Sequence, residues 1–397
     1  SQAMDEALLT KAFKALIERH EILRTVYYKE QGIPYQRLLS HQNWTLTVIK
    51  EEDLQPEQDW HQWMTQEIAR PFDLATDYMI RACLLKRVAG EKVLILTLHH
   101  IATDAWSNNI LIEELLEYYT AFSEQRPVFL DPLVVQYADF ALWERDYLSK
   151  EVLSSKLTWW KNRLKGAEPL GIPTDFARPA IKSSRGGEES LSLSPKLSRE
   201  LKELAASSGA TLFMTILALL KVLLYRYSGQ TDICVGAPVR GRNLPGLEPL
   251  IGFFINNIVL RSKLSGLESF ENLLARIQKE TLEAYDHQDT PFDQIVEAIG
   301  ERRDNSRNPL FQVLLSVNQE QNKTEAPGVP PLASQEMPIS FNTALDLHFS
   351  VEESASGLSL SIAYSGDLFR PATIKGMLSH FEQLSQSVVE HSAVSVG

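Results

Sequence analysis

Apolar residues recur along this chain in two patterns, and together they predict a mixed helix–sheet protein. A spacing of three to four residues predicts helices over Ala7–Thr25, Leu201–Tyr227 and Pro371–Val389. Short apolar runs predict buried strands, because both faces of such a strand are covered. These runs are Val93–Leu98, Thr231–Gly236, a strand within Ile251–Arg261, Phe311–Val317, Leu345–Val351 and Leu358–Tyr364, the last two joined around Gly357.

The chain divides near its middle. Residues 166–187 contain several prolines and glycines and few apolar pairs, which is typical of a linker. We therefore expect an N-terminal lobe over residues 1–165, a linker over 166–187 and a C-terminal lobe over 188–397. A length of 397 residues favours two such domains over one large core.

Composition excludes several classes of protein. A hydrophobic content of 44% is ordinary for a globular chain, and no uncharged apolar run approaches the ~18 residues that span a bilayer. A formal net charge of -12 argues against nucleic-acid binding, which needs a basic face. Cys83 and Cys234 lie in apolar stretches and predict core positions, so we expect no disulfides and a cytoplasmic location.

The most informative segment is the run His99-His100-Ile101-Ala102-Thr103-Asp104-Ala105-Trp106. It follows the predicted strand Val93–Leu98, and helical spacing of apolar residues resumes near Ser107. Two imidazoles and a carboxylate are therefore placed on a turn held by rigid elements, where side chains often face a cleft. Because the ordinary pKa of histidine is close to neutrality, such a turn suits proton handling or hydrogen bonding to a reacting amine.

Other catalytic classes lack their motifs. The chain has no Gly-x-Ser-x-Gly elbow of a serine hydrolase and no phosphate-binding Gly-x-x-x-x-Gly-Lys loop. His20-Glu21 lacks the second histidine of a zinc hydrolase motif. Adjacent strand histidines point to opposite faces, which disfavours metal binding by His99 and His100. We expect no metal site.

Six blocks, taken together, carry a family resemblance. They resemble, in order and spacing, the condensation domains of nonribosomal peptide synthetases, from the first helix to about residue 390. The blocks are Arg19–Thr25, His99–Asp104, Tyr137–Trp143, Ile251–Asn257, His287–Asp293 and Ser306–Val313.

The resemblance implies both a fold and an activity. The fold would be α/β, with two chloramphenicol-acetyltransferase-like lobes in a V-shaped pseudo-dimer and a central tunnel. The activity would be that of an acyltransferase that forms a peptide bond between two thioesters in antibiotic or secondary-metabolite biosynthesis. Its partners would be donor and acceptor carrier proteins, whose phosphopantetheine arms deliver the substrates, and a neighbouring adenylation domain. No cofactor would be bound directly, and no membrane or nucleic acid would be involved.

The resemblance also assigns roles to residues. His100 matches the family's second histidine and would hydrogen-bond the amine and the developing charge, or act as general base. His99 would orient the turn through a hydrogen bond. Asp104 would form a structural ion pair with Arg24, or alternatively with Arg19. The tunnel would be lined by Ala105, Trp106, Ser107, Asn256 and Ser316, although Asn256 reads equally well as a strand cap.

Two departures from the family pattern affect these expectations. The family motif ends in Asp-Gly, whereas this chain has Asp104-Ala105. If that site needs a positive φ, alanine costs roughly 1 kcal/mol, and if its methyl group points into the tunnel it narrows the path. The family also carries an early block before the first helix that is missing here, so we expect the sequence to begin inside the domain.

Three functional interpretations remain open at this point. The blocks look most like domains that join an L-configured donor to an L-configured acceptor. A starter type that accepts a fatty acyl donor, or acyl transfer to a soluble acceptor, would use the same turn. From another class, a non-catalytic member of the fold would recruit partner enzymes or gate carriers.

Overall fold

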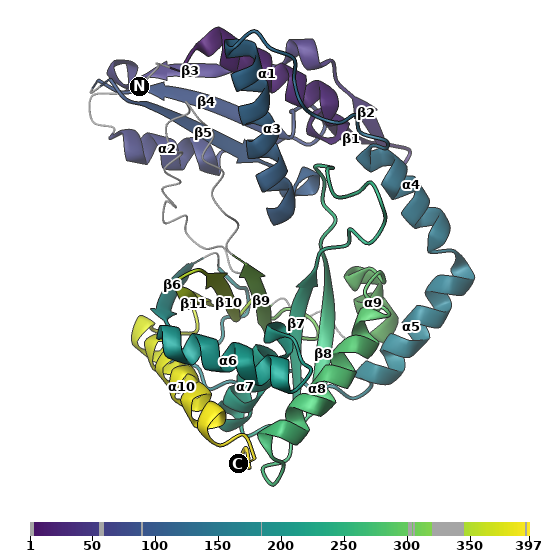
Figure 1. The fold of residues 1–397 in the computed structure, drawn as a ribbon. Coiled ribbons are helices and arrows are strands. Elements are labelled where there is room, and N and C mark those ends of the chain that lie inside the picture. The colour runs from purple at the N-terminus through teal and green to yellow at the C-terminus, as the bar shows by residue number, and fades with distance from the viewer. Residues whose placement is uncertain are drawn as a thin grey trace. The chain divides into compact units, whose positions relative to one another are not determined.

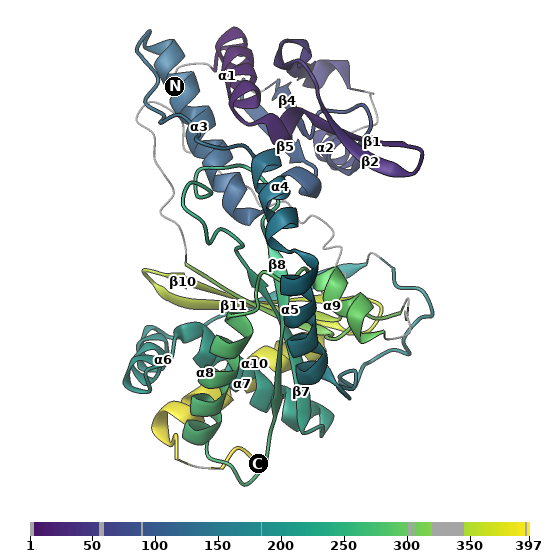
Figure 2. The same ribbon diagram turned by 90° about the vertical axis from the view of Figure 1, so that its right-hand side faces the viewer.

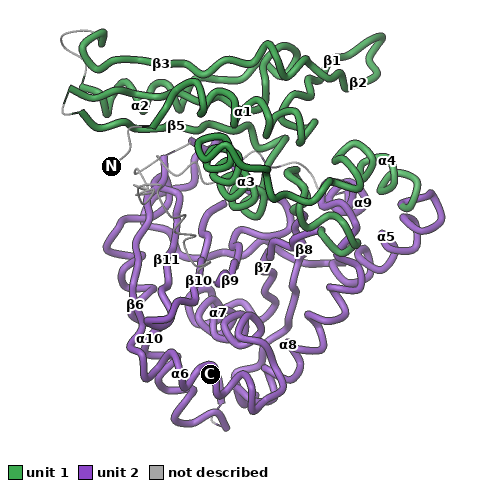
Figure 3. The backbone as a smooth tube through the Cα atoms, turned by 45° about the horizontal axis from the view of Figure 1, so that its top comes forward, with its two compact units in different colours: residues 1–147, 242–255, 323–335 green, residues 148–241, 256–322, 336–397 purple. Residues whose placement is uncertain are grey.

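The computed structural model describes residues 4–54, 59–88, 90–183, 185–300, 304, 306–319, 345–393 and 395–397. Residues 320–344 of the predicted C-terminal lobe therefore lie outside the described part. The described chain forms two compact units (Figure 3). Unit 1 contains residues up to Tyr147 and the segment Arg242–Ile255, and unit 2 contains Leu148–Gly241 and most residues from Asn256 onward.

Unit 1 is a small sheet with helices packed on it (Figure 1). Its sheet has the order β3-β4-β5, in which β3 pairs with β4 in parallel and β4 with β5 antiparallel. A separate antiparallel pair is formed by β1 and β2. The elements are α1 (Glu6–Arg19), β1 (Thr25–Glu30), β2 (Ile33–Leu38), β3 (Thr47–Lys50), α2 (Trp60–Ala69), β4 (Ile80–Lys86), β5 (Lys92–Leu98), α3 (Ala105–Ser123) and α4 (Tyr137–Tyr147), with short 3-10 turns η1 (Glu21–Arg24), η2 (His41–Asn43), η3 (Glu51–Asp53) and η4 (His100–Ala102).

Helices α1 and α3 form the main core of unit 1 together with β4. Helix α1 begins at the cap Asp5, whose carboxylate accepts hydrogen bonds from the backbone N–H groups of Ala7 and Leu8. Its apolar face recurs every three to four residues and includes Phe13 and Leu16, which are fully buried. This packing fixes the end of β5 and the start of α3, between which the histidine turn lies.

Unit 2 is built on a sheet of order β6-β11-β10-β9-β7-β8. Strand β9 runs parallel to both β7 and β10, and the other neighbours pair antiparallel. Figure 2 shows α6, α7, α8 and α10 on one side of this sheet. The elements are α5 (Lys150–Leu164), β6 (Gly186–Ser192), α6 (Pro195–Ser207), α7 (Leu212–Ser228), β7 (Asp232–Val239), β8 (Asn256–Lys263), α8 (Phe270–Tyr285), α9 (Phe292–Ile299), β9 (Val313–Gln319), β10 (Leu347–Ser354), β11 (Gly357–Ser365) and α10 (Pro371–Glu390).

The predicted helices and strands are largely confirmed. The periodic stretch over 201–227 forms α6 and α7 with a break at Ser208–Thr211, and the pair joined around Gly357 forms β10 and β11. Both cysteines are free and buried, as predicted. The strand predicted within Ile251–Arg261 is β8, which begins at Asn256, while residues 251–255 belong to a loop of unit 1.

The division into units differs from the predicted lobe boundary at residue 165. Helix α5 belongs to unit 2, because its residues Trp160 and Leu164 are buried in the core of that unit. The segment over 166–187 has no described helix or strand before Gly186, in agreement with its proline and glycine content. Leu170 and Ile172 are nevertheless buried in the same core, so this segment packs against unit 2.

No single helix among the described residues is long and apolar enough to cross a membrane. Helices α6 and α7 reach that length and apolar character only when they are taken together, and the pair bends by 106° at its break.

Helix α7 carries a buried lysine in the core of unit 2. Lys221 is 1% exposed, and its ammonium donates a hydrogen bond to the Ser262 hydroxyl (2.6 Å), which in turn contacts the Glu280 carboxylate. Burial lowers the pKa of Lys221 to about 8, an effect that outweighs the opposing charge of Glu280. The charged form is therefore less favoured in the folded chain than in the unfolded one.

This shift predicts a dependence of stability on pH. Between the folded pKa of about 8 and the unfolded value near 10.4, the unfolded chain binds more protons, so the free energy of unfolding rises with pH. Relative to Lys221→Met, wild type should gain about 2 kcal/mol between pH 8 and pH 10, measured by urea unfolding. The exposed Lys196→Met serves as the control. A difference between wild type and Lys221→Met that does not change with pH would contradict the assignment.

Candidate active site

The histidine turn lies between β5 and α3 of unit 1, as the sequence predicts. The backbone N–H of His99 donates to the carbonyl of Met79, which extends the pairing of β4 with β5 by one position. The 3-10 turn η4 follows at once, and α3 begins at Ala105 with Asp104 as its cap. Two secondary-structure elements and a capped helix start therefore fix the position of both histidines.

The His100 side chain is exposed, and its geometry determines which ring nitrogen is protonated. His100 Nδ1 lies 2.6 Å from the carbonyl oxygen of Thr103. Since a carbonyl oxygen only accepts, Nδ1 carries the proton in the neutral ring, and Nε2 keeps a free lone pair. The ring packs edge-on against Phe253, with centroids 5.1 Å apart. Within the described residues Nε2 has no hydrogen-bond partner, so it is available to a ligand.

The other histidine serves the turn itself. His99 Nδ1 accepts a hydrogen bond from the backbone N–H of Ile101 (3.1 Å), and its ring packs edge-on against Phe72. Burial lowers the pKa of His99, and the nearby His100 adds a smaller effect in the same direction. The lowered pKa favours the neutral ring that this hydrogen bond needs. This hydrogen bond joins the His99 ring to the backbone of the turn.

Asp104 is buried and faces several hydrogen-bond donors. Its Oδ1 accepts from the backbone N–H of Ser107 (2.8 Å) and from the Ser107 hydroxyl (2.7 Å), and its Oδ2 accepts from the backbone N–H of Phe254 (3.1 Å). Arg242 forms the ion pair, with Nη2 3.3 Å from Oδ1. Both side chains are 4% exposed, so the pair is shielded from water.

The ion-pair partners expected for Asp104 are corrected by this geometry. Arg24 instead bonds Glu21 and the carbonyl of Leu39, and Arg19 pairs with Glu114. Both arginines belong to α1 and the turn after it, and each pairs with a nearer carboxylate. Arg242 is supplied by the distant segment Arg242–Ile255.

Arg242 also organises the segment to which it belongs. Its Nη1 donates to the carbonyls of Leu247 and Leu250 (both 2.7 Å), and its guanidinium lies 4.0 Å above the Phe254 ring. Burial lowers the pKa of Arg242, and the charge of Asp104 opposes this effect. No sequence motif predicted the role of Arg242. The sequence shows only that a positively charged residue stands in the stretch before the Ile251–Asn257 block.

A second polar link holds the same segment. The buried His20 accepts a hydrogen bond at Nδ1 from the backbone N–H of Ile251 (3.3 Å), and its Nε2 donates to Glu114 (2.7 Å). Gly252 must be a glycine here, because a Cβ atom would lie 2.3 Å from the Tyr137 ring. Tyr137 itself donates to the carbonyl of Phe253 (2.8 Å). The blocks around Arg19, Tyr137 and Ile251 thus meet next to the histidine turn.

The residues expected to line a substrate tunnel divide into distinct groups. Ser107 is fully buried and contacts Asp104, Arg242 and both backbone polar groups of Gly252, so it fixes the loop and lines no path. Trp106 donates through its indole N–H to the carbonyl of Glu248 (3.2 Å). Ala105 is exposed and is not among the described non-glycine residues with positive φ, because it begins α3. The condition under which this alanine would be strained, a positive φ, is therefore not met.

The other two expected tunnel residues lie in unit 2. The Asn256 amide donates to the carbonyls of Gln288 (2.8 Å) and Thr290 (2.7 Å) and accepts from the N–H of Phe292 (3.1 Å). Its hydrogen-bonding capacity is thus largely used to hold the His287–Asp293 block. Ser316 lies on β9, with its hydroxyl 3.0 Å from His348 Nε2 and 3.1 Å from the Ser350 hydroxyl.

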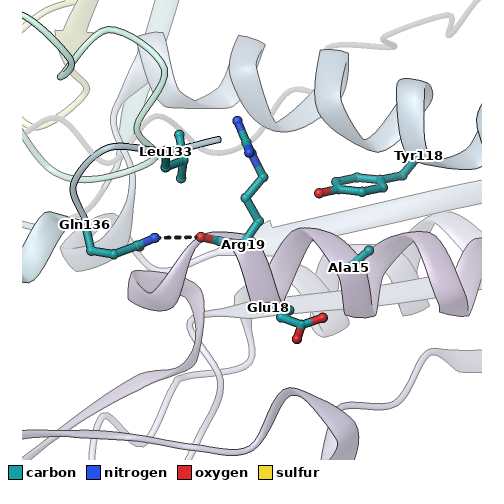
Figure 4. A pocket seen from close by; sticks show the side chains of 6 residues that line it. All are labelled: Ala15, Glu18, Arg19, Tyr118, Leu133 and Gln136. Atoms are coloured by element: carbon teal, nitrogen blue, oxygen red, sulfur yellow. Dashed lines mark hydrogen bonds between the residues drawn. The ribbon is translucent and has the colours of Figure 1, made fainter. Parts of the chain in front are cut away.

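An open pocket of about 400 Å³ lies between α1 and α3 of unit 1, away from this turn (Figure 4). Gln136 donates to the backbone carbonyl of Arg19 at its edge (2.9 Å), and the Arg19 Nε bonds Glu114. Because these groups serve the fold, we assign no chemistry to the pocket. It is lined by Ala15, Glu18, Arg19, Tyr118, Leu133 and Gln136.

Comparison with known proteins identifies the family. The chain matches the condensation-domain family over residues 1–397 and belongs to it. It is 41% identical over 392 residues to one component of the linear gramicidin synthase of Brevibacillus parabrevis, covering 97% of this chain and 8% of that protein. Malpinin synthetase of Mortierella alpina is 37% identical over 379 residues, covering 94% of this chain and 5% of that protein. The chain therefore spans only a small part of these relatives.

Solved structures share the fold. The X-domain from teicoplanin biosynthesis is 29% identical with a TM-score of 0.85, covering 99% of this chain and 89% of that one. A four-domain nonribosomal peptide synthetase has the same TM-score at 21% identity, covering all of this chain and 31% of that one. The predicted mixed α/β fold of the chloramphenicol-acetyltransferase type, and the relationship to condensation domains of peptide synthetases, are confirmed.

The buried ion pair generates a prediction about stability. In Asp104→Ala the Arg242 cation stays buried without its carboxylate, so the free energy of unfolding should fall by about 3–5 kcal/mol. Glu203→Ala is the matched control, because Glu203 belongs to an exposed pair with Arg199 and should cost under about 1 kcal/mol. Urea unfolding compares the two variants. An equal, small loss in both would show that the ion pair does not hold the loop.

Proposed function

We propose that this domain forms a peptide bond between a donor aminoacyl or peptidyl thioester and an acceptor aminoacyl thioester, each tethered to a carrier protein by phosphopantetheine. The observation that carries the proposal is the exposed His100 ring, whose Nδ1–H is held by Thr103 and whose Nε2 has no hydrogen-bond partner among the described residues. Membership of the condensation-domain family and the likeness to synthases of linear gramicidin support it.

The reaction needs positioning more than activation. The neutral amine of the acceptor attacks the thioester carbonyl, a C–N bond forms, and the C–S bond breaks as the tetrahedral intermediate collapses. One amine proton ends on the departing thiol. Holding the two groups in line supplies about 7–11 kcal/mol of the barrier reduction, because the bimolecular step becomes effectively unimolecular.

In this scheme His100 Nε2 accepts a hydrogen bond from the attacking amine. The bond orients the nitrogen lone pair and strengthens as positive charge develops on the amine, so it stabilises the transition state more than the ground state. His100 also relays the proton that the amine loses. In the alternative role, His100 removes this proton itself as a general base. His99 and Asp104 are positioning residues, since each bonds the turn or the loop.

The finer features of the function extend the same proposal. The partners are donor and acceptor carrier proteins and a neighbouring adenylation domain, and no cofactor other than the carriers' phosphopantetheine takes part. The domain joins an L-configured donor to an L-configured acceptor. This part of the proposal rests on its sequence blocks, which resemble those of such domains. Ala105 and Trp106 lie closest along the chain to the histidine turn and contribute to the substrate path. A starter-type domain with a fatty acyl donor would use the same His100.

A second candidate function is recruitment of a partner protein. A specific observation favours it, since a solved structure at 30% identity and TM-score 0.84 is a complex of the X-domain with OxyB from teicoplanin biosynthesis. The histidine turn counts against recruitment. It keeps an exposed imidazole whose Nδ1–H is held by the Thr103 carbonyl, an arrangement that recruitment does not require. We therefore place condensation first.

The test is condensation between donor-loaded and acceptor-loaded carrier proteins, with the product measured by mass spectrometry. Wild type should form product, and His100→Ala should lower the rate about a hundredfold or more. Ala105→Gly should stay within about threefold of wild type, because Ala105 is unstrained. His391→Ala, at an exposed histidine beyond α10, is the control. Folded wild type that yields no product with authentic carriers would favour recruitment, and an active His100→Ala would overturn the role of His100.

A further inference from the structure

The sheet of unit 2 has one apolar face and one polar face on strands β6, β11, β10 and β9. Alternate residues such as Phe349 and Leu360 are buried in the core with helices α6, α7 and α10. The residues between them point to the opposite face, where serines predominate. On β10 these are His348, Ser350 and Glu352.

Four serines form a continuous row across this polar face. Ser316 of β9 pairs with Ser350 of β10, Ser350 pairs with Ser361 of β11, and Ser361 pairs with Ser190 of β6. Directly paired residues point to the same face, and neighbouring strands are ~4.8 Å apart, so the hydroxyls form a line of roughly 14 Å. Antiparallel strands commonly carry polar residues on the face that is not packed on the core.

His348 closes one end of the row. Its Nε2 lies 3.0 Å from the Ser316 hydroxyl and 3.3 Å from the Ser350 hydroxyl, and these hydroxyls lie 3.1 Å from each other. Burial lowers the pKa of His348, so the ring is neutral near pH 7. A neutral imidazole and two hydroxyls can each donate or accept, and the cluster can reverse its hydrogen-bond direction as a unit.

Part of the row is unused by the protein. Among the described residues, neither the Ser361 nor the Ser190 hydroxyl has a hydrogen-bond partner, and His348 Nδ1 has none. The neighbouring positions on the same face include the exposed carboxylates Glu352 and Glu188, which repel anions. The face therefore offers uncharged donors and acceptors and disfavours a carboxylate or phosphate.

We propose that the row Ser316, Ser350, Ser361 and Ser190, with His348, is a recognition site for an uncharged hydroxyl- or carboxamide-bearing side chain of a carrier-bound substrate. This inference rests on the proposed function, which supplies the thioester-bound amino acids. A carboxamide or hydroxyl both donates and accepts, which matches the reversible cluster, whereas an aliphatic side chain would leave these groups without partners.

The test compares two ligands of similar shape, namely stable pantetheine amide analogues that carry N-acetyl-asparagine or N-acetyl-leucine. Calorimetry on wild type should give about five- to tenfold tighter binding of the asparagine analogue, the effect of roughly one uncharged hydrogen bond. Ser316→Ala, Ser350→Ala and His348→Leu should bring the ratio close to one. Ser207→Ala, at an exposed helix position, should keep the wild-type ratio, and thermal unfolding should confirm that every variant is folded.

The outcomes separate this inference from the proposed function. Equal binding of the two analogues by wild type, or a preference that survives all three substitutions, would overturn the recognition site. A condensation assay with leucine-loaded carriers runs in parallel, because it does not need the serine row. Product from leucine carriers alongside equal analogue binding would leave the proposed function standing without the site. Preferred binding of asparagine without product from any carrier pair would support the site and count against condensation.

Discussion

The buried ion pair between Asp104 and Arg242 is the constraint on which the geometry of the histidine turn depends. Asp104 caps α3 and bonds the backbone of Phe254, while Arg242 bonds the carbonyls of Leu247 and Leu250. One carboxylate therefore fixes both the helix that follows His100 and the loop whose Phe253 packs against it. Because both charges are shielded from water, losing either one leaves the other buried and uncompensated.

Much of the site's polar chemistry is used to position backbone rather than to meet a substrate. Ser107 contacts both backbone polar groups of Gly252, His20 bonds Ile251, and Asn256 bonds the turn near Thr290. Buried polar groups need partners, so a side chain next to a catalytic turn is often consumed by the fold. His100 differs from these residues, because one ring nitrogen is held and the other has no partner in the described part of the chain. That asymmetry gives the turn a defined reactive atom.

The sequence predicted the turn itself, because a strand pattern, two histidines and a helix pattern stand next to one another along the chain. It did not predict the partner of Asp104, since Arg242 lies 138 positions away and no local pattern links them. The family resemblance placed Ser107 on a substrate path, but helical geometry turns that side chain inward. The serine row was equally invisible, because it arises only when four strands adopt one register.

The central claim is that His100 presents an unprotonated Nε2 because Thr103 holds its Nδ1–H. The most direct measurement is a long-range nitrogen–proton NMR correlation on protein labelled at its nine histidines, with His100 assigned from the spectrum of His100→Gln. Above the pH at which the ring deprotonates, the account predicts that the Nδ1–H tautomer predominates and that Nε2 has the shift of a bare nitrogen. A predominant Nε2–H tautomer would contradict it, because the nitrogen facing the substrate would then be a donor.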